Sequence, residues 1–333
     1  MHACHATRRC TLLLITIIYF MLTNTATAFI LTPKLTHNKI HADPTTRSSL
    51  LHDTQNTVQL SQALHTINGL TCREVHINLH HIGMVTILEA TAEAQEQLVN
   101  LALGEDASIA ENVHHNLTVA HDDPYGSVLW PAASAIANHL IHLHLSDDNN
   151  FDLTKKSVLE VGAGTGLVSI AAGVAGCRDI LATDYEEVPL TLLRYATENL
   201  NPRILRDEIK IDTKLFDICD SDTDLPEADV LVAADIMYEP LTGKAMARRV
   251  YEALQRGSHV LVGDSPGRAG RPAFLAELRR LLGDDNQQID FVDAVGTTCS
   301  GPRHDLICGK GSTSVSDEPK MLEVAVLDLQ GPI

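Results

Sequence analysis

The stretch "LEVGAGTGL", Leu159–Leu167, is an apolar strand pattern that runs directly into three glycines at alternate positions. These glycines are Gly162, Gly164 and Gly166. Glycine allows a ligand to lie close to the backbone, and the N-terminus of the helix that follows attracts negative charge. Dinucleotides, nucleoside triphosphates and S-adenosylmethionine are all bound by turns of this kind, and each implies a different chemistry.

The spacing of the glycines argues against both phosphate-binding alternatives. A dinucleotide motif, G-x-G-x-x-G, would need its third glycine one residue later, where Leu167 stands. A Walker loop would need Lys and then Ser or Thr after the last glycine, but Leu167 and Val168 occupy those positions.

Two carboxylates favour S-adenosylmethionine as the cofactor. Asp184 ends the next strand, where an acid accepts hydrogen bonds from ribose hydroxyls. Glu160 lies just before the glycine turn, where a negative charge opposes a phosphate and favours a cationic ligand. S-adenosylmethionine has ribose hydroxyls, an ammonium and a sulfonium, and no phosphate. The alternative is that Glu160 is only structural and that the ligand is NAD.

Strand and helix patterns alternate on the C-terminal side of the turn, with "DILATDY", "IKIDTKLF", "ADVLVAADIMY" and "SHVLVGD" as strands. Continuous apolar strands are typical of a parallel sheet that helices cover on both faces. No helix pattern separates the last two strands, "QIDFVDAV" and "LEVAVLDL", so we expect them to pair antiparallel. The predicted fold is α/β: a doubly wound, Rossmann-like, mostly parallel seven-stranded sheet with an antiparallel edge pair.

The sequence before this sheet predicts a small extension with two strands and a helix, and then a further helix. "REVHINLH" and "GMVTILEA" read as strands, and "TAEAQEQLVNLAL" reads as a helix. A further helix is expected to begin at Pro131. It carries His139, His142 and His144, whose spacing does not suit a metal site, and we expect partly exposed histidines and no metal.

The N-terminus predicts a targeting segment. Arg8 and Arg9 precede the apolar run "TLLLITIIYFML", and "ATA" follows as a small-residue cleavage site, so residues 1–28 read as a signal peptide. A short membrane anchor is the alternative. Residues 29–60 read as a transit peptide or disordered linker, because the junction "TATAFILTP" is similar to the bipartite presequences of algae with secondary plastids. We expect plastid import, with secretion as the alternative, and no stable membrane span after cleavage.

Charge and cysteine content restrict the partners. A formal net charge of -18 at pH 7 argues against nucleic acid and suits a basic or lysine-bearing substrate. Five cysteines remain after the presequence, an odd number without a C-x-x-C motif, so free thiols are expected.

Three motifs carry a resemblance to a known family. "VLEVGAGTGL", "ATDY" and "AADIMY" resemble the motifs of seven-strand S-adenosylmethionine-dependent methyltransferases. More narrowly, the chain resembles the protein-lysine methyltransferase group, methyltransferase family 16. "VLVGDSPGR", Val260–Arg268, is also similar to the fifth-strand motif of the subgroup that acts on the electron transfer flavoprotein β subunit, with Ser265 inserted before Pro266.

The resemblance implies further cofactor contacts. It places Trp130 in the lining of the cofactor pocket, and Phe216 and Asp217 where the adenine binds. Ala234 is small and would allow the cofactor to approach its strand end. The structural alternatives are a packing role for Trp130 and a generic loop at Phe216 and Asp217.

Asp235 and Tyr238 match the D-x-x-Y motif that the resemblance implies after the fourth strand of the sheet, and they are the candidate catalytic residues. They follow an apolar strand at its carboxyl end, where ligands bind in such sheets. A lysine amine, with a pKa of about 10.4, must be neutral and aligned to accept a methyl group. Asp235 could orient the amine, and Tyr238 could wall its channel or accept a hydrogen bond. The alternative is that Asp235 caps the next segment and Tyr238 packs in the core.

The sequence therefore predicts a monomeric S-adenosylmethionine-dependent methyltransferase that acts on a lysine of a protein. The alternatives are a small-molecule N-methyltransferase and a non-catalytic binding protein with the same fold. The expected methyltransferase domain covers residues 121–333 and the extension covers residues 61–120. Arg268 and Arg271 form a basic loop that could bind an acidic part of the substrate or lie in solvent.

Overall fold

The computed structural model describes residues 57–103, 125–146, 151–206, 209–283, 289–298 and 320–330. The predicted signal peptide, and all of the predicted transit segment except its last four residues, lie outside the described residues. Within the described part of the chain, no helix combines the length and the apolar character that a membrane crossing requires.

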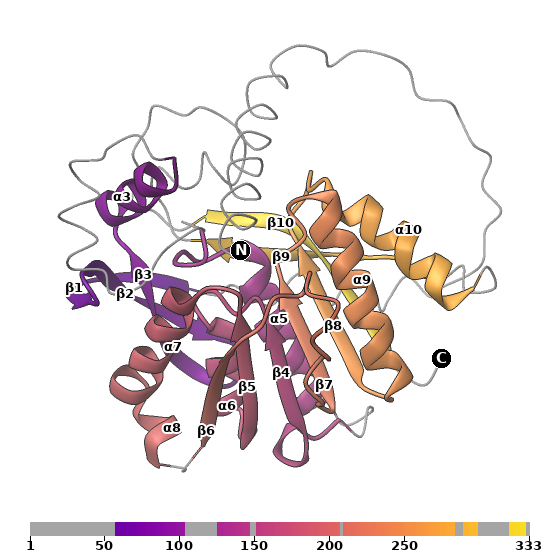
Figure 1. Ribbon diagram of the computed structural model, residues 1–333. Helices are drawn as coiled ribbons and strands as arrows, with labels where there is room; N and C mark the ends of the chain where they lie inside the picture. The colour runs from indigo at the N-terminus through magenta and orange to yellow at the C-terminus, as the bar shows by residue number, and fades with distance from the viewer. Residues whose placement is uncertain are drawn as a thin grey trace.

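A seven-stranded sheet forms the centre of the molecule, in the order β6-β5-β4-β7-β8-β10-β9 (Figure 1). Its strands are β4 Ser157–Val161, β5 Asp179–Asp184, β6 Lys210–Leu215, β7 Val230–Ala234, β8 His259–Asp264, β9 Val292–Thr298 and β10 Lys320–Gln330. Strands β4 to β8 are parallel. Strand β10 is antiparallel to both β8 and β9. The predicted fold class is thus confirmed, including its antiparallel edge pair.

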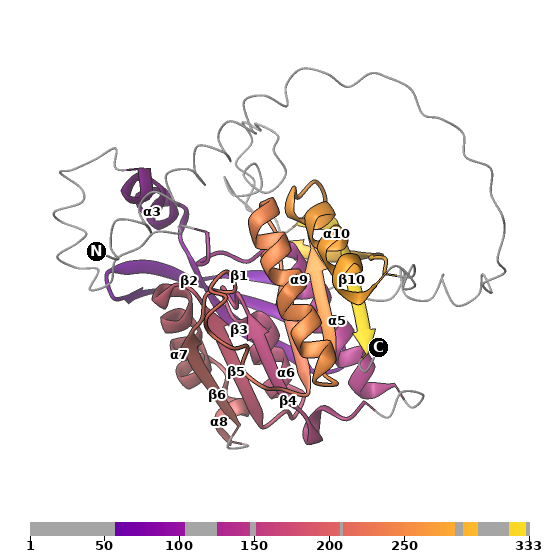
Figure 2. The same ribbon diagram turned by 45° about the vertical axis from the view of Figure 1, so that its right-hand side comes forward.

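Helices cover both faces of this sheet because its central strands are apolar on both sides. One face carries α5 Pro131–Leu145, α6 Leu167–Val174 and α7 Glu187–Leu200. Two short helices, η1 Leu153–Lys155 and α8 Pro202–Arg206, directly precede β4 and β6 in the chain. The other face carries α9 Pro240–Gln255 and α10 Gly270–Leu282, which lie side by side (Figure 2).

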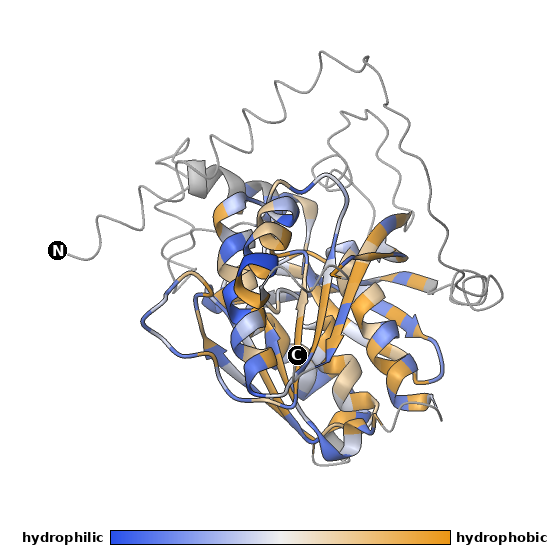
Figure 3. Cartoon of the chain, turned by 90° about the vertical axis from the view of Figure 1, so that its right-hand side faces the viewer, coloured by the Kyte–Doolittle hydropathy of each residue, from blue (hydrophilic) through white to orange (hydrophobic). Residues whose placement is uncertain are grey.

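Alternate residues of β4 separate the two cores. Val158 belongs to the cluster with α5 and α6, whereas Leu159 and Val161 belong to the cluster with α9 and α10. Successive strand residues point to opposite faces of the sheet, so a strand that is apolar at every position contributes side chains to both hydrophobic clusters. The hydropathy colouring agrees, with largely hydrophobic strands between helices of mixed character (Figure 3).

A separate three-stranded antiparallel sheet precedes this domain. It contains β1 Thr57–Ile67, β2 Leu70–Leu79 and β3 Gly83–Ala90, and α3 Ala92–Leu103 follows it. The two predicted strands and the helix are confirmed, but β1 is not among the predicted elements. A register shift between Leu60 and Leu64 breaks the alternation of its side chains, which removes the pattern that identifies a strand.

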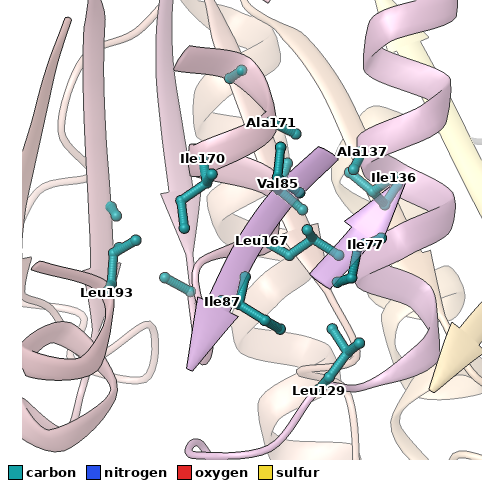
Figure 4. Packing of buried hydrophobic residues seen from close by; sticks show 14 of the residues in the cluster. Ile77, Val85, Ile87, Leu129, Ile136, Ala137, Leu167, Ile170, Ala171 and Leu193 are labelled. Atoms are coloured by element: carbon teal, nitrogen blue, oxygen red, sulfur yellow. The ribbon is translucent and has the colours of Figure 1, made fainter. Parts of the chain in front are cut away.

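The small sheet packs against the helix layer. Ile77, Val85 and Ile87 contribute to the same apolar cluster as Ile136 of α5 and Leu167 of α6 (Figure 4). The face of the helices that points away from the large sheet is therefore covered by β2 and β3. This packing gives the extension a fixed position beside the segment that leads into α5.

Candidate active site

The glycine turn after β4 is a tight, left-handed loop. Gly162, Gly164 and Gly166 have φ angles of 66°, 53° and 73°. A Cβ atom at Gly162 would lie 2.4 Å from Ile236 Cγ2, and one at Gly166 would lie 2.3 Å from Leu193 Cδ1. Both the backbone conformation and the packing therefore require glycine.

Asp184 holds this turn from the end of the neighbouring strand. Its Oδ2 accepts a hydrogen bond from the Gly164 amide at 3.0 Å, and its Oδ1 accepts one from the Glu186 amide at 3.1 Å. A carboxylate oxygen has two lone pairs, so it can accept more than one hydrogen bond. The structure thus brings Asp184 and the glycine turn together, as the motif spacing predicts.

Glu160 is buried in the sheet and is engaged with helix α6. Its Oε2 accepts hydrogen bonds from the Ser169 amide at 2.9 Å and from the Ser169 hydroxyl. Burial raises the pKa of the Glu160 carboxyl to about 7, although the hydrogen bonds from Ser169 oppose that shift. These contacts fit the structural alternative, and a direct contact of Glu160 with the cofactor stays a prediction.

Trp130 lies at the N-cap of α5, in a segment that approaches the glycine turn at Gly126. Its Nε1 donates to the Tyr125 carbonyl at 3.1 Å, and the two rings meet edge to face. The preceding Gly126 carbonyl lies 3.3 Å from the position that a Cβ atom would take at Gly164. The guanidinium of Arg268 lies over the indole ring, 4.5 Å from its centroid.

Phe216 and Asp217 follow β6, and Ala234 ends β7, so β5 and β4 lie between them in the sheet. Phe216 is buried in the core below α9, with the Arg249 guanidinium 5.1 Å from its ring centroid. Asp217 is exposed, and its Oδ1 accepts from the Cys219 amide at 2.8 Å. Ala234 is partly buried at the end of β7.

Asp235 connects three elements through its carboxylate. Its Oδ2 accepts from the Ala132 amide at 2.8 Å, in the first turn of α5. Its Oδ1 accepts from the Ser265 amide at 2.7 Å, directly after β8. Asp235 is buried and has a φ of 57°. It therefore caps a segment, but that segment is the distant helix α5 rather than the one that follows Asp235.

Tyr238, the other candidate catalytic residue, is partly buried in the loop between β7 and α9. The loop is stabilised at its far end by a capping box between Glu239 and Thr242. The two residues of the D-x-x-Y motif thus lie in one short loop between β7 and α9.

Asp264, which is not among the site residues predicted from the sequence, is a buried acid at the same edge of the sheet. It ends β8, is fully buried, and its Oδ2 accepts from Arg271 Nε at 2.8 Å. Burial and then the nearby charge of Asp235 raise the pKa of the Asp264 carboxyl to about 7, against the opposing effect of Arg271. The sequence does contain the signal for Asp264, which is an acid at the end of an apolar strand, as at Asp184 and Asp235.

Glu89 of the small sheet also reaches the site and was not selected from the sequence. Its Oε1 accepts from the Leu129 amide at 3.1 Å, and its Oε2 lies 3.3 Å from Arg73 Nη2. The Ala90 amide donates to the Ser127 carbonyl at 3.0 Å. The extension therefore holds the segment that carries Trp130. A buried acid at the end of the apolar strand "GMVTILEA" is the sequence signal that could have indicated this contact.

Two of the three helix histidines have carboxylate neighbours that the sequence pattern does not predict. His139 Nε2 lies 2.7 Å from Asp328 Oδ2, and His144 Nδ1 lies 3.9 Å from Asp152 Oδ1. Both pairs come from separate elements. Among the residues that the structure describes, no group of three or more side chains has the arrangement of a metal site.

Comparison with known proteins identifies one family. A family model described as lysine methyltransferase matches residues 111–280, just over half of the chain. The chain is 28% identical over 161 residues to the electron transfer flavoprotein beta subunit lysine methyltransferase of Rattus norvegicus, covering 46% of this chain and 54% of that protein. It is 42% identical over 66 residues to the protein-lysine methyltransferase METTL21E of Mus musculus, covering 20% and 25%.

The chain spans about half the length of the first curated relatives that it matches. Among solved structures, it is similar to the ribosomal protein L11 methylase from Lactobacillus delbrueckii subsp. bulgaricus. That match has a TM-score of 0.36 and 15% identity, and covers 60% of this chain and 79% of the other.

Proposed function

Because the chain belongs to the lysine methyltransferase family, we propose that it is an enzyme that transfers a methyl group from S-adenosylmethionine to a lysine of a protein. One observation carries this proposal most directly. The glycine turn held by Asp184 and the loop from Asp235 to Tyr238 lie at the carboxyl ends of the adjacent strands β4 and β7. A methyl donor and an acceptor bound at these two places would be neighbours.

The residues of the glycine turn fit the cofactor. Gly164 has a φ of 53°, and a Cβ atom there would lie 3.3 Å from the Gly126 carbonyl oxygen, so the position favours glycine. Because glycine has no side chain, a ligand can approach the backbone of the turn closely. The Asp184 carboxylate would accept hydrogen bonds from the ribose hydroxyls. We assign the adenine to the side of Phe216 and Asp217, and the methionine portion to the side of Trp130 and Ala234. S-adenosylmethionine would supply the electrophilic methyl group.

The protein's own contribution would be alignment and desolvation. A free lysine ammonium must lose its proton before its nitrogen can attack, and a site that excludes water lowers the pKa of that ammonium. Asp235 would keep the loop in place through its two backbone hydrogen bonds, acting as a positioning residue. Tyr238 would form the wall along which the amine approaches. Correct alignment alone is worth about 7–11 kcal/mol in favourable cases.

Transfer of labelled methyl groups tests this proposal. The purified protein is incubated with methyl-labelled S-adenosylmethionine and either recombinant electron transfer flavoprotein β subunit, the substrate in the names of several relatives, or an organelle extract. We expect a labelled protein band that disappears with Asp184→Ala. Label found only in small molecules would contradict a protein substrate, and no binding of the cofactor in calorimetry would contradict the enzyme.

The destination of the protein is a separate proposal that rests on residues 1–60 alone. We propose import into a plastid through the bipartite presequence. A fluorescent protein fused behind these residues should accumulate in plastids of an alga with secondary plastids. Fluorescence confined to the secretory route would favour the alternative.

A further inference from the structure

The loop after β8 contains hydrogen-bond donors that no described residue satisfies. Arg268 Nε and Nη2 are buried without a hydrogen-bond partner among the residues that the structure describes, and the same holds for the Ser265 hydroxyl. Ser265 is only 2% exposed. Buried polar groups are nearly always hydrogen-bonded in folded proteins, so a group of unsatisfied donors in one loop indicates that a ligand supplies the acceptor.

Arg271, three residues further on, has a structural role in this loop, because it donates hydrogen bonds to Asp264 and Ser265. Its Nε donates to Asp264 Oδ2 at 2.8 Å, and its Nη2 donates to the carbonyls of Asp264 and Ser265 at 2.7 and 2.9 Å. Oδ2 of the buried Asp264 carboxylate is therefore paired with Arg271, whereas its Oδ1 has no hydrogen-bond partner among the described residues. The positive charge of Arg268 also acts on Asp264, but without a hydrogen bond to it.

Trp130 holds the Arg268 guanidinium in a defined orientation. The guanidinium lies 4.5 Å from the indole centroid, within the range of a cation–π interaction. The indole is itself anchored by its hydrogen bond to the Tyr125 carbonyl. An arginine stacked on an aromatic ring loses little further entropy when it binds a planar carboxylate, to which it can donate two parallel hydrogen bonds.

The loop after β8 packs against the loop that carries Asp235 and Tyr238. A Cβ atom at Gly270 would lie 2.3 Å from the Met237 carbonyl oxygen and 2.6 Å from that of Glu239, so the loops after β7 and β8 are in close contact. Strand β7 separates β8 from β4. Two strand spacings, about 10 Å, therefore lie between the ends of β8 and of the strand that carries the glycine turn.

We propose that Arg268, stacked on Trp130, binds a carboxylate of the protein substrate close to the lysine that is methylated. This inference rests on the proposed function and adds a rule for its substrate: a lysine with an acidic side chain nearby is preferred. The overall charge of -18 repels a strongly acidic partner. The recognition is therefore local, with one carboxylate beside the lysine on a surface that is otherwise neutral or basic.

Binding of short peptides tests the inference without turnover. The protein is saturated with S-adenosylhomocysteine and titrated with peptides that carry one central lysine and a glutamate at one flanking position at a time. Matched peptides carry glutamine instead. Trp130 is the only tryptophan in the chain, so its fluorescence reports binding beside Arg268. At the best position we expect the glutamate peptide to bind about tenfold more tightly than its glutamine counterpart. This is the gain in affinity that one charge-assisted hydrogen bond provides.

Three variants identify the residue responsible. Arg268→Gln should bind both peptides of a pair equally, and Arg268→Lys should keep part of the preference because it retains the charge but not the planar fork. Arg178→Gln, at an exposed arginine just before β5, should behave like the wild type.

Several results would overturn the inference. These are equal affinities for all peptide pairs in the wild type, a preference that survives Arg268→Gln, and a tenfold loss of S-adenosylhomocysteine affinity in that variant. The last result would assign the arginine to the carboxylate of the cofactor. The absence of methyl transfer to proteins would contradict the proposed function but would leave this binding preference measurable.

Discussion

Asp235 Oδ2 accepts a hydrogen bond from the Ala132 amide at 2.8 Å, although 103 positions separate the two residues in the chain. With the second bond, from the Ser265 amide, the carboxylate joins the start of α5 to the end of β8. Acids at helix N-termini are stabilising because they satisfy free amides and complement the helix dipole. The acid of the D-x-x-Y motif thus assembles the edge of the sheet at which the acceptor is expected.

Asp235→Ala should destabilise the protein as well as impair methyl transfer. It leaves two backbone amides without an acceptor, which costs about 2–5 kcal/mol in the free energy of unfolding. Displacement of the loop should lower the transfer rate about 100-fold. Denaturant unfolding and the transfer assay measure both effects. Asp235→Asn tolerates the positive φ angle and keeps one acceptor, so its loss of stability should be smaller. A fully stable Asp235→Ala protein would contradict the structural role.

Glu160→Gln should change how stability depends on pH. The folded state keeps Glu160 protonated up to a pKa of about 7, whereas the unfolded chain loses that proton near 4.5. The folded state therefore binds more protons between these values, and the stabilisation present at low pH is lost as the pH rises through 7.

Glutamine cannot ionise and can still accept hydrogen bonds from Ser169. The stability of Glu160→Gln relative to the wild type should consequently improve by about 2–3 kcal/mol between pH 5 and pH 8. Urea unfolding at several pH values measures the difference, with Glu198→Gln at an exposed helix position as the control. Asp264, whose pKa is also raised to about 7, should leave a slope of the same sign in the variant. Parallel pH profiles for Glu160→Gln and the wild type would refute this account.

Gly162→Ala should be more harmful than Gly267→Ala, although both glycines have positive φ angles of 66° and 78°. A Cβ atom at Gly267 meets nothing within 4 Å, whereas one at Gly162 would lie 2.4 Å from Ile236 Cγ2. Gly267→Ala therefore measures the backbone strain alone, about 1 kcal/mol, and Gly162→Ala adds the clash. The double variant Gly162→Ala/Ile236→Ala should recover part of the difference in thermal unfolding. Equal losses in the two single variants would argue against the close packing at Ile236.

Glu89→Ala should weaken the link between the small sheet and the cofactor side of the site. It removes the acceptor of the Leu129 amide and leaves the partly buried Arg73 without its carboxylate neighbour. We expect a loss of about 3–5 kcal/mol in stability, as for other broken buried ion pairs, and weaker binding of S-adenosylhomocysteine. Calorimetry and thermal unfolding measure these effects, and Glu93→Ala on the exposed surface of α3 is the matched control. Unchanged cofactor affinity in a folded variant would show that the small sheet does not influence the site.

The sequence predicts the local parts of this protein correctly. The glycine turn, the apolar parallel strands, the antiparallel edge pair and the start of α5 at Pro131 are each encoded within a few consecutive residues. Strand β1 escapes prediction because a register shift interrupts its alternation. The motif spacing also places Asp184 beside the glycine turn, since parallel neighbouring strands end at the same edge of a sheet.

By itself, then, the sequence determines the sheet, the glycine turn and the acids that end its strands, because hydrophobic period and turn chemistry act over short distances. Only the tertiary structure decides what those acids do. Asp235 holds the start of α5, and Glu89 reaches the Trp130 segment from the extension. Arg268 stacks on Trp130, and its Nε and Nη2 have no hydrogen-bond partner among the described residues. Each of these contacts joins segments that are distant in the chain, and which distant groups meet depends on how the layers pack.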